Sequence, residues 1–213
     1  YYLYYSYDFS GVIGVAVCDS PAGKYEFHGY VHHPGEERLW SRSGDPVLFD
    51  PGVFVDQDNR VYLYTGFAPE YPMPAFTTYG IRHTFHGGYG MELEEDMITV
   101  KNDPILLFPG VHLSKGTSYK GHEFFEASSM RRFGNTYYFV YSSVQGHELC
   151  FATSQNPLGG FEYGGVLISN GDLTGSGQVS GATPEETGIQ QGLPVSRLSK
   201  RSRDRAAMNY TGN

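Results

Sequence analysis

Short stretches of alternating apolar and polar residues recur along the chain, and aromatic residues dominate their apolar positions. Three of the clearest are YYLYYSY at 1–7, RVYLYTGF at 60–67 and TYYFVYSS at 136–143. A period of two residues is typical of β-strands, because successive side chains point to opposite faces of a sheet. The 28 glycines and 12 prolines favour the tight turns that join such strands. The pattern predicts an all-β fold and argues against helical bundles and coiled coils.

The chain also contains an internal repeat at an offset of 136 residues. Residues 1–32 lie over residues 137–168 without a gap. The identical pairs include Tyr1 and Tyr137, Tyr2 and Tyr138, Tyr5 and Tyr141, Ser6 and Ser142, Pro21 and Pro157, and Gly29 and Gly165. Each copy reads as strand, turn, strand, Pro-Gly turn and short strand. A third, partial copy covers RVYLYTGF and then YGIRHTF at 79–85.

Antiparallel units that recur in this way predict a β-propeller with one unit in each blade. Long loops such as residues 36–51 would explain why the repeat exceeds an ordinary blade period. A β-sandwich with aromatic strands is the alternative fold. We expect residues 1–171 to form propeller blades, and residues 172–213, rich in Gly, Ser and Arg, to form a loop or insertion. We also expect the propeller to be incomplete, with the first strand or strands before Tyr1 and the last blades after Asn213.

Two carboxylates occupy equivalent places at the entrance to successive blades. Asp50 comes eleven residues before Val61, and Glu126 comes eleven residues before Tyr137. Each acid follows an apolar pair and precedes an apolar strand, a polar turn and an aromatic strand. Because the innermost strands of a propeller run side by side along a central channel, we expect both acids near one end of that channel.

The neighbouring residues indicate how these acids ionise. Phe124 and Phe125 would partly desolvate Glu126, and a second carboxylate nearby would raise its pKa further. Pro51 is expected to hold Asp50 in an extended conformation. A carboxyl group that stays protonated near neutral pH, beside an ionised one, can protonate the leaving oxygen of a glycoside.

Structural roles are the alternative for these residues and for the histidines. In that case Asp50 would cap a turn, and Glu126 would pair with Arg131 or Arg132. The five histidines on later loops and strands lack metal-ligand spacing, and we interpret each as structural or groove-lining. They are His83, His86, His112, His122 and His147.

The sequence around the acids resembles glycoside hydrolase family 43, the five-bladed propeller enzymes that cleave arabinose- and xylose-containing glycans. The matching stretches are FDPGVFVDQDNRVYLYTGF, HEFFEASSMRRFGNTYYFVYSS and HELCFATSQNPLGGFEYGGVLIS. In addition, YYLYYSYDFSGVIGVAVCDSPAGKYEF resembles the close of the first blade of that family. Together these stretches lie within residues 1–171.

The resemblance implies an inverting mechanism that three acids share. Glu126 matches the general acid, and Asp50, in its Asp-Pro setting, matches the aspartate that tunes the pKa of the acid and orients it. The general base of the family belongs to an Asp-Pro motif on the first strand of blade one. We expect that strand upstream of Tyr1, because Asp8 and Asp19 lie on the wrong strands.

The resemblance also bears on the substrate pocket and on cofactors. Phe54, Phe125 and Trp40 are candidates for aromatic side chains that stack on the sugar or wall the pocket. No cofactor is required, and we assign no metal ligand within the chain. A structural metal ion at the propeller centre is compatible with the family, but its histidine ligand would lie beyond Asn213.

Charge, hydropathy and cysteine content indicate which kinds of partner and which compartment to expect. The formal net charge is −8, and the single basic run falls in the polar tail, so we expect no nucleic-acid partner. That run contains Arg197, Lys200, Arg201, Arg203 and Arg205. No stretch of 18 apolar residues is present, so we expect no membrane span. We interpret Cys18 and Cys150 as two buried free thiols, which favours a reducing compartment such as the cytoplasm.

The expected function is therefore hydrolysis of O-glycosidic bonds in arabinose- or xylose-containing plant poly- or oligosaccharides, of the α-L-arabinofuranosidase or β-xylosidase type. One alternative is a carbohydrate-binding propeller without catalysis. Another is a related five-bladed glycosidase for a different sugar, although the fructan group carries Arg-Asp-Pro and Glu-Cys where this chain has Phe-Asp-Pro and Phe-Glu-Ala. A structural or protein-binding propeller would not explain two equivalent acids. The sugar, the linkage, endo or exo action and the oligomeric state stay open.

Overall fold

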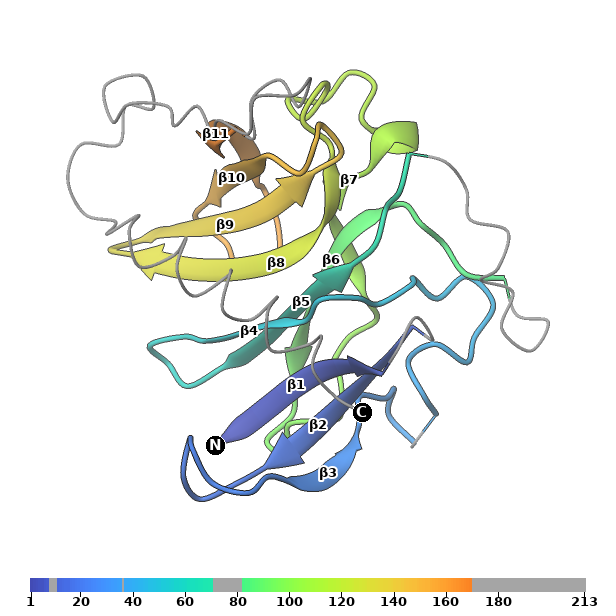
Figure 1. Ribbon diagram of the computed structural model, residues 1–213, viewed down its shortest axis with the longest axis vertical. Helices are drawn as coiled ribbons and strands as arrows, with labels where there is room; N and C mark the ends of the chain where they lie inside the picture. The colour runs from blue at the N-terminus through green and yellow to red at the C-terminus, as the bar shows by residue number, and fades with distance from the viewer. Residues whose placement is uncertain (8–10, 36, 71–81, 170–213) are drawn as a thin grey trace, which may run out of the picture. The chain divides into compact units, whose positions relative to one another are not determined.

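The computed structural model of the chain describes residues 1–7, 11–35, 37–70 and 82–169. These residues form three antiparallel sheets, which follow one another along the chain (Figure 1). Sheet 1 contains β1 (Tyr2–Tyr7), β2 (Val12–Val17) and β3 (Glu26–Tyr30). Sheet 2 contains β4 (Gly52–Val55), β5 (Val61–Gly66), β6 (Gly87–Leu93) and β7 (Ile105–Pro109). Sheet 3 contains β8 (Phe124–Phe133), β9 (Thr136–Ser143), β10 (Leu149–Ser154) and β11 (Glu162–Ile168).

In every sheet each strand pairs with the next one along the chain, so all three sheets are simple meanders. The regular elements of the described residues are these strands and a short 3-10 turn at Val111–Leu113. The all-β prediction is confirmed. The region 172–213, predicted as a loop or insertion, lies outside the described residues, as do the basic run and Asp8.

The internal repeat corresponds to a repeat of strand pairing. Tyr2 pairs with Val17 between β1 and β2, and the residues 136 positions later, Tyr138 and Thr153, pair between β9 and β10. The register shift between β2 and β3 falls after Val15, and one between β10 and β11 falls at the equivalent place. β1–β2–β3 is therefore the structural counterpart of β9–β10–β11, as the sequence repeat predicted.

The expectation that YGIRHTF forms the second strand of the partial copy is wrong. Residues 79–81 of this stretch lie outside the described part, and Thr84 forms only an isolated bridge with Pro46. The strand that follows β5 and pairs with it is β6, whose sequence is GGYGMEL. Its glycines hide the alternation that marks the other strands. They are needed because a Cβ atom on Gly88 would come within 2.8 Å of the Phe124 ring.

The two larger apolar cores of the described residues lie between the sheets. The core between sheets 2 and 3 is aromatic, and the rings of Phe108 and Phe139 stack with their centroids 3.7 Å apart. The core between sheets 1 and 2 is mainly aliphatic, with Ile13, Leu63 and Met91 almost completely buried. Much of the high aromatic content is thus core filling, which stabilises through the large area that each ring removes from water.

The cysteines and the membrane prediction can be placed in this fold. Both cysteines are free, Cys150 is fully buried in β10, and Cys18 is only half-buried, just after β2. The expectation of two buried thiols therefore holds for Cys150 alone. Within the described ranges, the chain has no helix that is both long and apolar enough to span a bilayer.

Candidate active site

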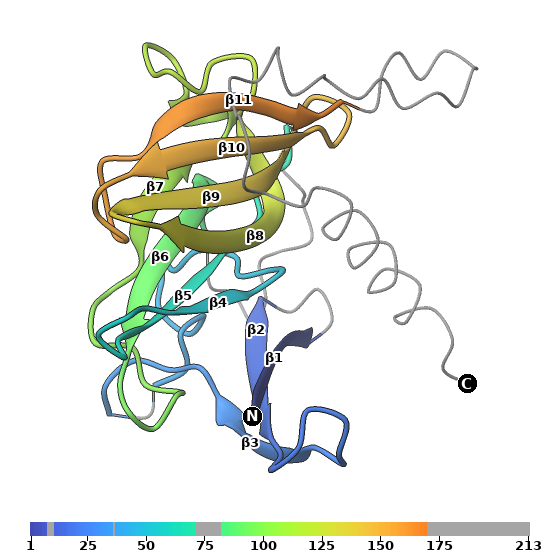
Figure 2. The same ribbon diagram turned by 90° about the vertical axis from the view of Figure 1, so that its left-hand side faces the viewer.

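Asp50 and Glu126 lie at the starts of two neighbouring strands. Asp50 comes two residues before β4, and Glu126 is the third residue of β8. The two strands approach so closely that a Cβ atom on Gly52 would come within 2.2 Å of the carbonyl oxygen of Ser128. Figure 2 shows β4 and β8 as the adjoining edges of sheets 2 and 3. The first strands of successive sheets therefore lie side by side, as the propeller prediction required.

The backbone is irregular at both acids. Asp50 has a φ angle of +47°, in the left-handed region, so the expected extended conformation is wrong. Its N–H donates to Ser6 Oγ of β1 at 3.0 Å, and this bond to another sheet outweighs the preference that Pro51 imposes. Ala127, next to Glu126, has a φ of +64° within a bulge that interrupts the pairing of β8 with β9. Such strain is often found at functional sites.

The surroundings of Glu126 keep it protonated to an unusually high pH. Burial raises the pKa of Glu126 to about 7, and the negative charge of Asp50 adds to the increase. Burial also raises the pKa of Asp50 above its ordinary value. At neutral pH about half of the Glu126 carboxyl groups would carry a proton, which suits a general acid.

A histidine that the sequence did not mark as special contacts Glu126. His147 Nδ1 lies 3.8 Å from Glu126 Oε1, and its ring meets that of Phe125 edge to face, with centroids 5.0 Å apart. Its side chain is 61% exposed, and Ser142 Oγ lies 3.3 Å from the same nitrogen. The backbone at His147 is left-handed, with a φ of +59°. The turn between β9 and β10 therefore holds an ionisable group beside the acid.

The three aromatic candidates occupy different surroundings. Phe125 adjoins Glu126 and packs against Phe67, with ring centroids 5.3 Å apart. Phe54 packs edge to face on Tyr137 beside the aromatic core, at 6.1 Å, which is a structural environment. Trp40 lies on the loop between β3 and β4, with the Arg38 guanidinium 5.9 Å from its ring. Of the three, Phe125 is the one that the described contacts place at the acids.

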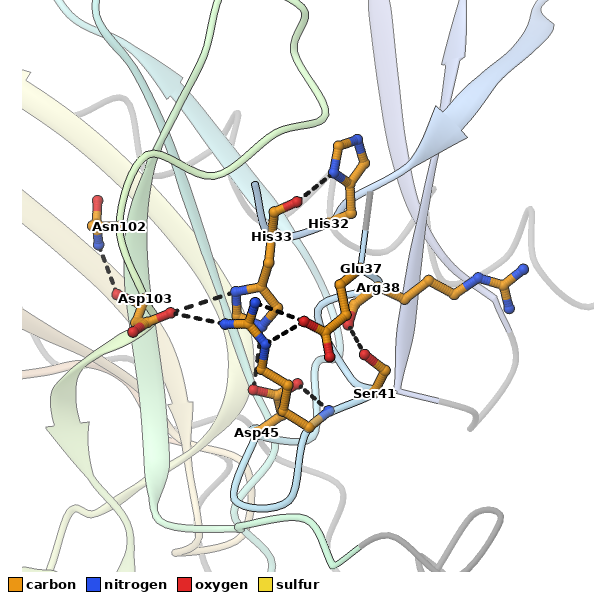
Figure 3. A network of polar contacts seen from close by, with 9 residues as sticks. His32, His33, Glu37, Arg38, Ser41, Asp45, Asn102 and Asp103 are labelled. Atoms are coloured by element: carbon orange, nitrogen blue, oxygen red, sulfur yellow. Dashed lines mark hydrogen bonds and ion pairs between the residues drawn. The ribbon is translucent and has the colours of Figure 1, made fainter. Parts of the chain in front are cut away.

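The loop that leads to Asp50 is anchored by a buried histidine. His33 is 1% exposed and lies between two carboxylates: its Nε2 is 3.4 Å from Asp45 Oδ1, and its Nδ1 is 3.4 Å from Asp103 Oδ1 (Figure 3). Arg42 bridges Glu37 at 2.7 Å and Asp103 at 3.6 Å. These contacts tie the loop to the connection between β6 and β7, so the approach to Asp50 is held from sheet 2 as well as from sheet 1.

Glu126 does not pair with Arg131 or Arg132, as the structural alternative required. Arg132 Nη1 lies 2.6 Å from Asp56 Oδ1, and Arg131 donates to the carbonyl oxygen of Met130. Neither arginine neutralises Glu126.

One of the five histidines, His122, lies in a polar cluster on sheet 3. His122 Nδ1, a carboxylate oxygen of Glu148 and Cys150 Sγ all lie within 4.8 Å of one another, so these three residues could hold a cation. Sequence spacing hid this group, because 26 residues separate the histidine from the glutamate. His147 lies beside the acid, as described above.

Comparisons with known proteins show which family the chain resembles. The family described as Glycosyl hydrolases family 43 matches residues 1–175. A xylosidase/arabinosidase of Thermoclostridium stercorarium is 50% identical over 173 residues, which are 81% of this chain and 34% of that protein. A β-xylosidase of Xylanibacter ruminicola is 30% identical over 195 residues, covering 79% of this chain and 53% of that protein. The chain thus spans about a third to a half of the length of these relatives.

Solved structures agree with the sequence relatives. The compost-metagenome enzyme CoXyl43, a family 43 β-xylosidase/α-arabinofuranosidase in complex with xylotriose, aligns with a TM-score of 0.56 and 27% identity over 78% of this chain and 53% of its own. The arabinoxylan arabinofuranohydrolase of Bacillus subtilis gives 0.57 and 27% over 83% of this chain and 35% of its own. The prediction of an incomplete family 43 propeller is confirmed, with the three sheets as its blades. The chain belongs to glycosyl hydrolase family 43.

Proposed function

We propose that the protein containing this chain hydrolyses O-glycosidic bonds in arabinose- or xylose-containing saccharides, with inversion at the anomeric carbon. The observation that carries the proposal is Glu126 itself, half-buried beside Asp50, with its pKa raised to about 7. Support for the sugar class comes from relatives named for xylose and arabinose, and from a solved relative complexed with xylotriose.

In this mechanism Glu126 donates its proton to the glycosidic oxygen as the bond from that oxygen to the anomeric carbon breaks. Water attacks the anomeric carbon from the opposite face and loses a proton to a second carboxylate. Inverting enzymes place this base roughly 6.5–9.5 Å from the acid, which leaves room for the water. We propose that this base lies on a strand that precedes Tyr1, as the family resemblance implies.

Asp50 would act on Glu126 rather than on the sugar. Its negative charge makes ionisation of Glu126 less favourable, so the proton stays on the acid at the pH where the base is already ionised. The left-handed backbone at Asp50 and its bond to Ser6 hold the main chain of this residue in place. We therefore propose Asp50 as the residue that orients the acid and tunes its pKa.

The test is hydrolysis by the longest natural protein that contains this chain, with and without Glu126→Gln. Aryl arabinofuranosides and xylosides need little protonation of the leaving group, whereas arabino- and xylo-oligosaccharides need full protonation. We expect Glu126→Gln to lower kcat on the oligosaccharides by about 10²–10⁴-fold, and by much less on the aryl glycosides. Following the first-formed product by NMR would show the inverted anomer.

Glu162→Gln is the matched control, because Glu162 lies on β11 and accepts a hydrogen bond from Ser118, away from the acids. It should leave both rates unchanged. Equal loss on aryl and oligosaccharide substrates would contradict the acid assignment. Sugar binding without any turnover by the wild-type protein would instead identify a carbohydrate-binding propeller.

A further inference from the structure

A second polar cluster lies on sheet 3, outside the acid pair. It joins His122, on the segment before β8, to Glu148, just before β10, and Cys150, on β10. His122 Nδ1 is 3.1 Å from Glu148 Oε2, and Cys150 Sγ lies within 4.8 Å of both ligand atoms. Glu148 and Cys150 are two residues apart, so their side chains emerge on the same face of the strand.

The backbone of each residue is held in place by its neighbours. The His122 N–H donates to Tyr119, and its carbonyl accepts the Tyr141 hydroxyl at 2.7 Å. Glu148 is fixed by backbone bonds at both its N–H and its carbonyl oxygen, within the β9–β10 turn. Cys150 pairs in register with Tyr141 of β9. The cluster is thus built on rigid elements, as a preorganised site requires.

The side chains are also oriented, and they remain accessible from one side. The His122 ring stacks on Tyr163 at 4.9 Å, with an angle of 8° between the planes. The side chains of His122 and Glu148 are 35% and 19% exposed, whereas Cys150 is fully buried. A cation would therefore enter past the imidazole and the carboxylate and meet the sulfur at the inner end.

From this geometry we propose that His122, Glu148 and Cys150 form a binding site for a borderline transition-metal cation, with Zn²⁺ as the reference ion. One imidazole nitrogen, one carboxylate oxygen and one thiolate are a donor set that such cations accept, whereas Ca²⁺ and Mg²⁺ require oxygen ligands. In a tetrahedral zinc site, ligand atoms lie roughly 3.3–3.8 Å apart, so the three atoms, which lie within 4.8 Å of one another, would draw together as the metal binds. Water would supply the fourth ligand.

Binding would release protons in a defined way. The metal would lie between the His122 nitrogen and the Glu148 oxygen, which are now 3.1 Å apart. Burial raises the pKa of the Cys150 thiol to about 11, so the S–H bond must give up its proton to solvent as the sulfur–metal bond forms. Hydrogen bonds from Ser143 and Tyr163 favour the thiolate and would stabilise it once it is bound.

The experiment titrates the metal-free protein with Co²⁺ and then with Zn²⁺. We expect one equivalent of Co²⁺ to produce a thiolate-to-cobalt charge-transfer band, which Zn²⁺ then abolishes. Cys150→Ser should remove the band. Cys18→Ser is the matched control, since Cys18 is the other free thiol and lies outside the cluster, and it should retain the band.

Two more variants keep the proposal testable if Cys150→Ser fails to fold. His122→Gln and Glu148→Gln change partly exposed side chains, and each should weaken Zn²⁺ binding by at least about 10–100-fold in calorimetry. His28→Gln, on exposed β3, should leave the affinity unchanged. The proposal is overturned if Co²⁺ gives no thiolate band, if the band survives in Cys150→Ser, or if all variants bind Zn²⁺ equally. The readout is independent of glycosidase activity.

Discussion

The adjoining strands β4 and β8 place their carboxyl groups in opposite environments at their two ends. At one end, Asp50 and Glu126 are held close together with raised pKa values and distorted backbone. At the other end, Asp56 directly follows β4 and is paired with Arg132 near the end of β8. The Tyr137 hydroxyl donates to the second Asp56 oxygen at 2.5 Å.

The comparison shows that Asp56 is a carboxylate that stabilises the fold, whereas Asp50 and Glu126 are carboxyl groups whose ionisation the fold makes less favourable. Burial alone would raise the pKa of Asp56, but hydrogen bonds from Tyr137 and Arg132 hold it below the ordinary value. At the Asp50 end, burial raises both pKa values, and among the described residues no donor to Asp50 offsets it. The same two strands therefore keep one acid ionised at acidic pH and another protonated near neutrality.

The largest effect on stability should come from replacing Asp56, which is paired with Arg132 and Tyr137. Asp56→Asn places an amide N–H₂ against Arg132 or Tyr137, and we expect it to lower the free energy of unfolding by about 2–3 kcal/mol at pH 7. Because the folded pKa of Asp56 is lowered, its contribution is present at neutral pH and is lost as pH falls through that lowered value. Urea denaturation at several pH values should show wild type and variant converging in acid, and a constant difference down to pH 2 would contradict the assignment.

Removing the charge at the other end should affect catalysis rather than stability. Asp50→Asn lowers the pKa of Glu126, so less of the acid is protonated at pH 7, and we expect kcat/KM to fall by about 10–100-fold on oligosaccharides. The alkaline limb of the pH–rate profile should move to lower pH. Asparagine tolerates the left-handed backbone at this position, so the melting temperature should not fall. An unchanged alkaline limb would rule out the tuning role.

Glu126→Gln should show the reverse of the Asp56 stability profile. A carboxyl group with a raised folded pKa stabilises fully below its unfolded value near 4.5, and the stabilisation disappears as pH rises through about 7. The neutral amide avoids this loss. After allowance for partial exposure and screening, we expect the variant to be about 1–2 kcal/mol more stable than wild type at pH 9 and equal to it at pH 4. A variant less stable at pH 9 would show a structural role instead.

The smallest effect concerns His147. In its protonated form it places a positive charge 3.8 Å from Glu126, which favours ionisation of the acid. We expect His147→Asn to move the alkaline limb up by about 0.2–0.7 pH unit, since an exposed pair contributes little. Asparagine again accepts the left-handed backbone. The shift should shrink in 1 M salt, and a salt-independent shift would point to a change of packing rather than of charge.

Features set by local periodicity could be predicted from the sequence. The repeat at 136 residues anticipated the strands of sheets 1 and 3 and even their shared register. Equal spacing of Asp50 and Glu126 from their aromatic strands anticipated that these acids would lie near enough for one to influence the other. Burial between neighbouring phenylalanines indicated the direction in which the Glu126 pKa moves.

Features set by contacts between distant segments could not be predicted. The left-handed turn at Asp50 depends on Ser6, which is 44 residues away, and local rules for a residue before proline point elsewhere. β6 was missed because its glycines carry no alternation. The cluster of His122, Glu148 and Cys150 forms only when the segment before β8 folds against β10, so no motif announces it.

The meander pairing also determines the order in which the molecule can assemble. Each strand pairs with its chain neighbour, so sheet formation closes only short loops and has a low entropic cost. The contacts that define the acid site span 44 residues from Ser6 to Asp50, and those at the opposite end span 76 from Asp56 to Arg132. We therefore expect these nonlocal contacts to form after the hairpins and to open before them. On this basis the candidate active site would be a late product of folding, and we expect transient opening to abolish it while every sheet stays intact.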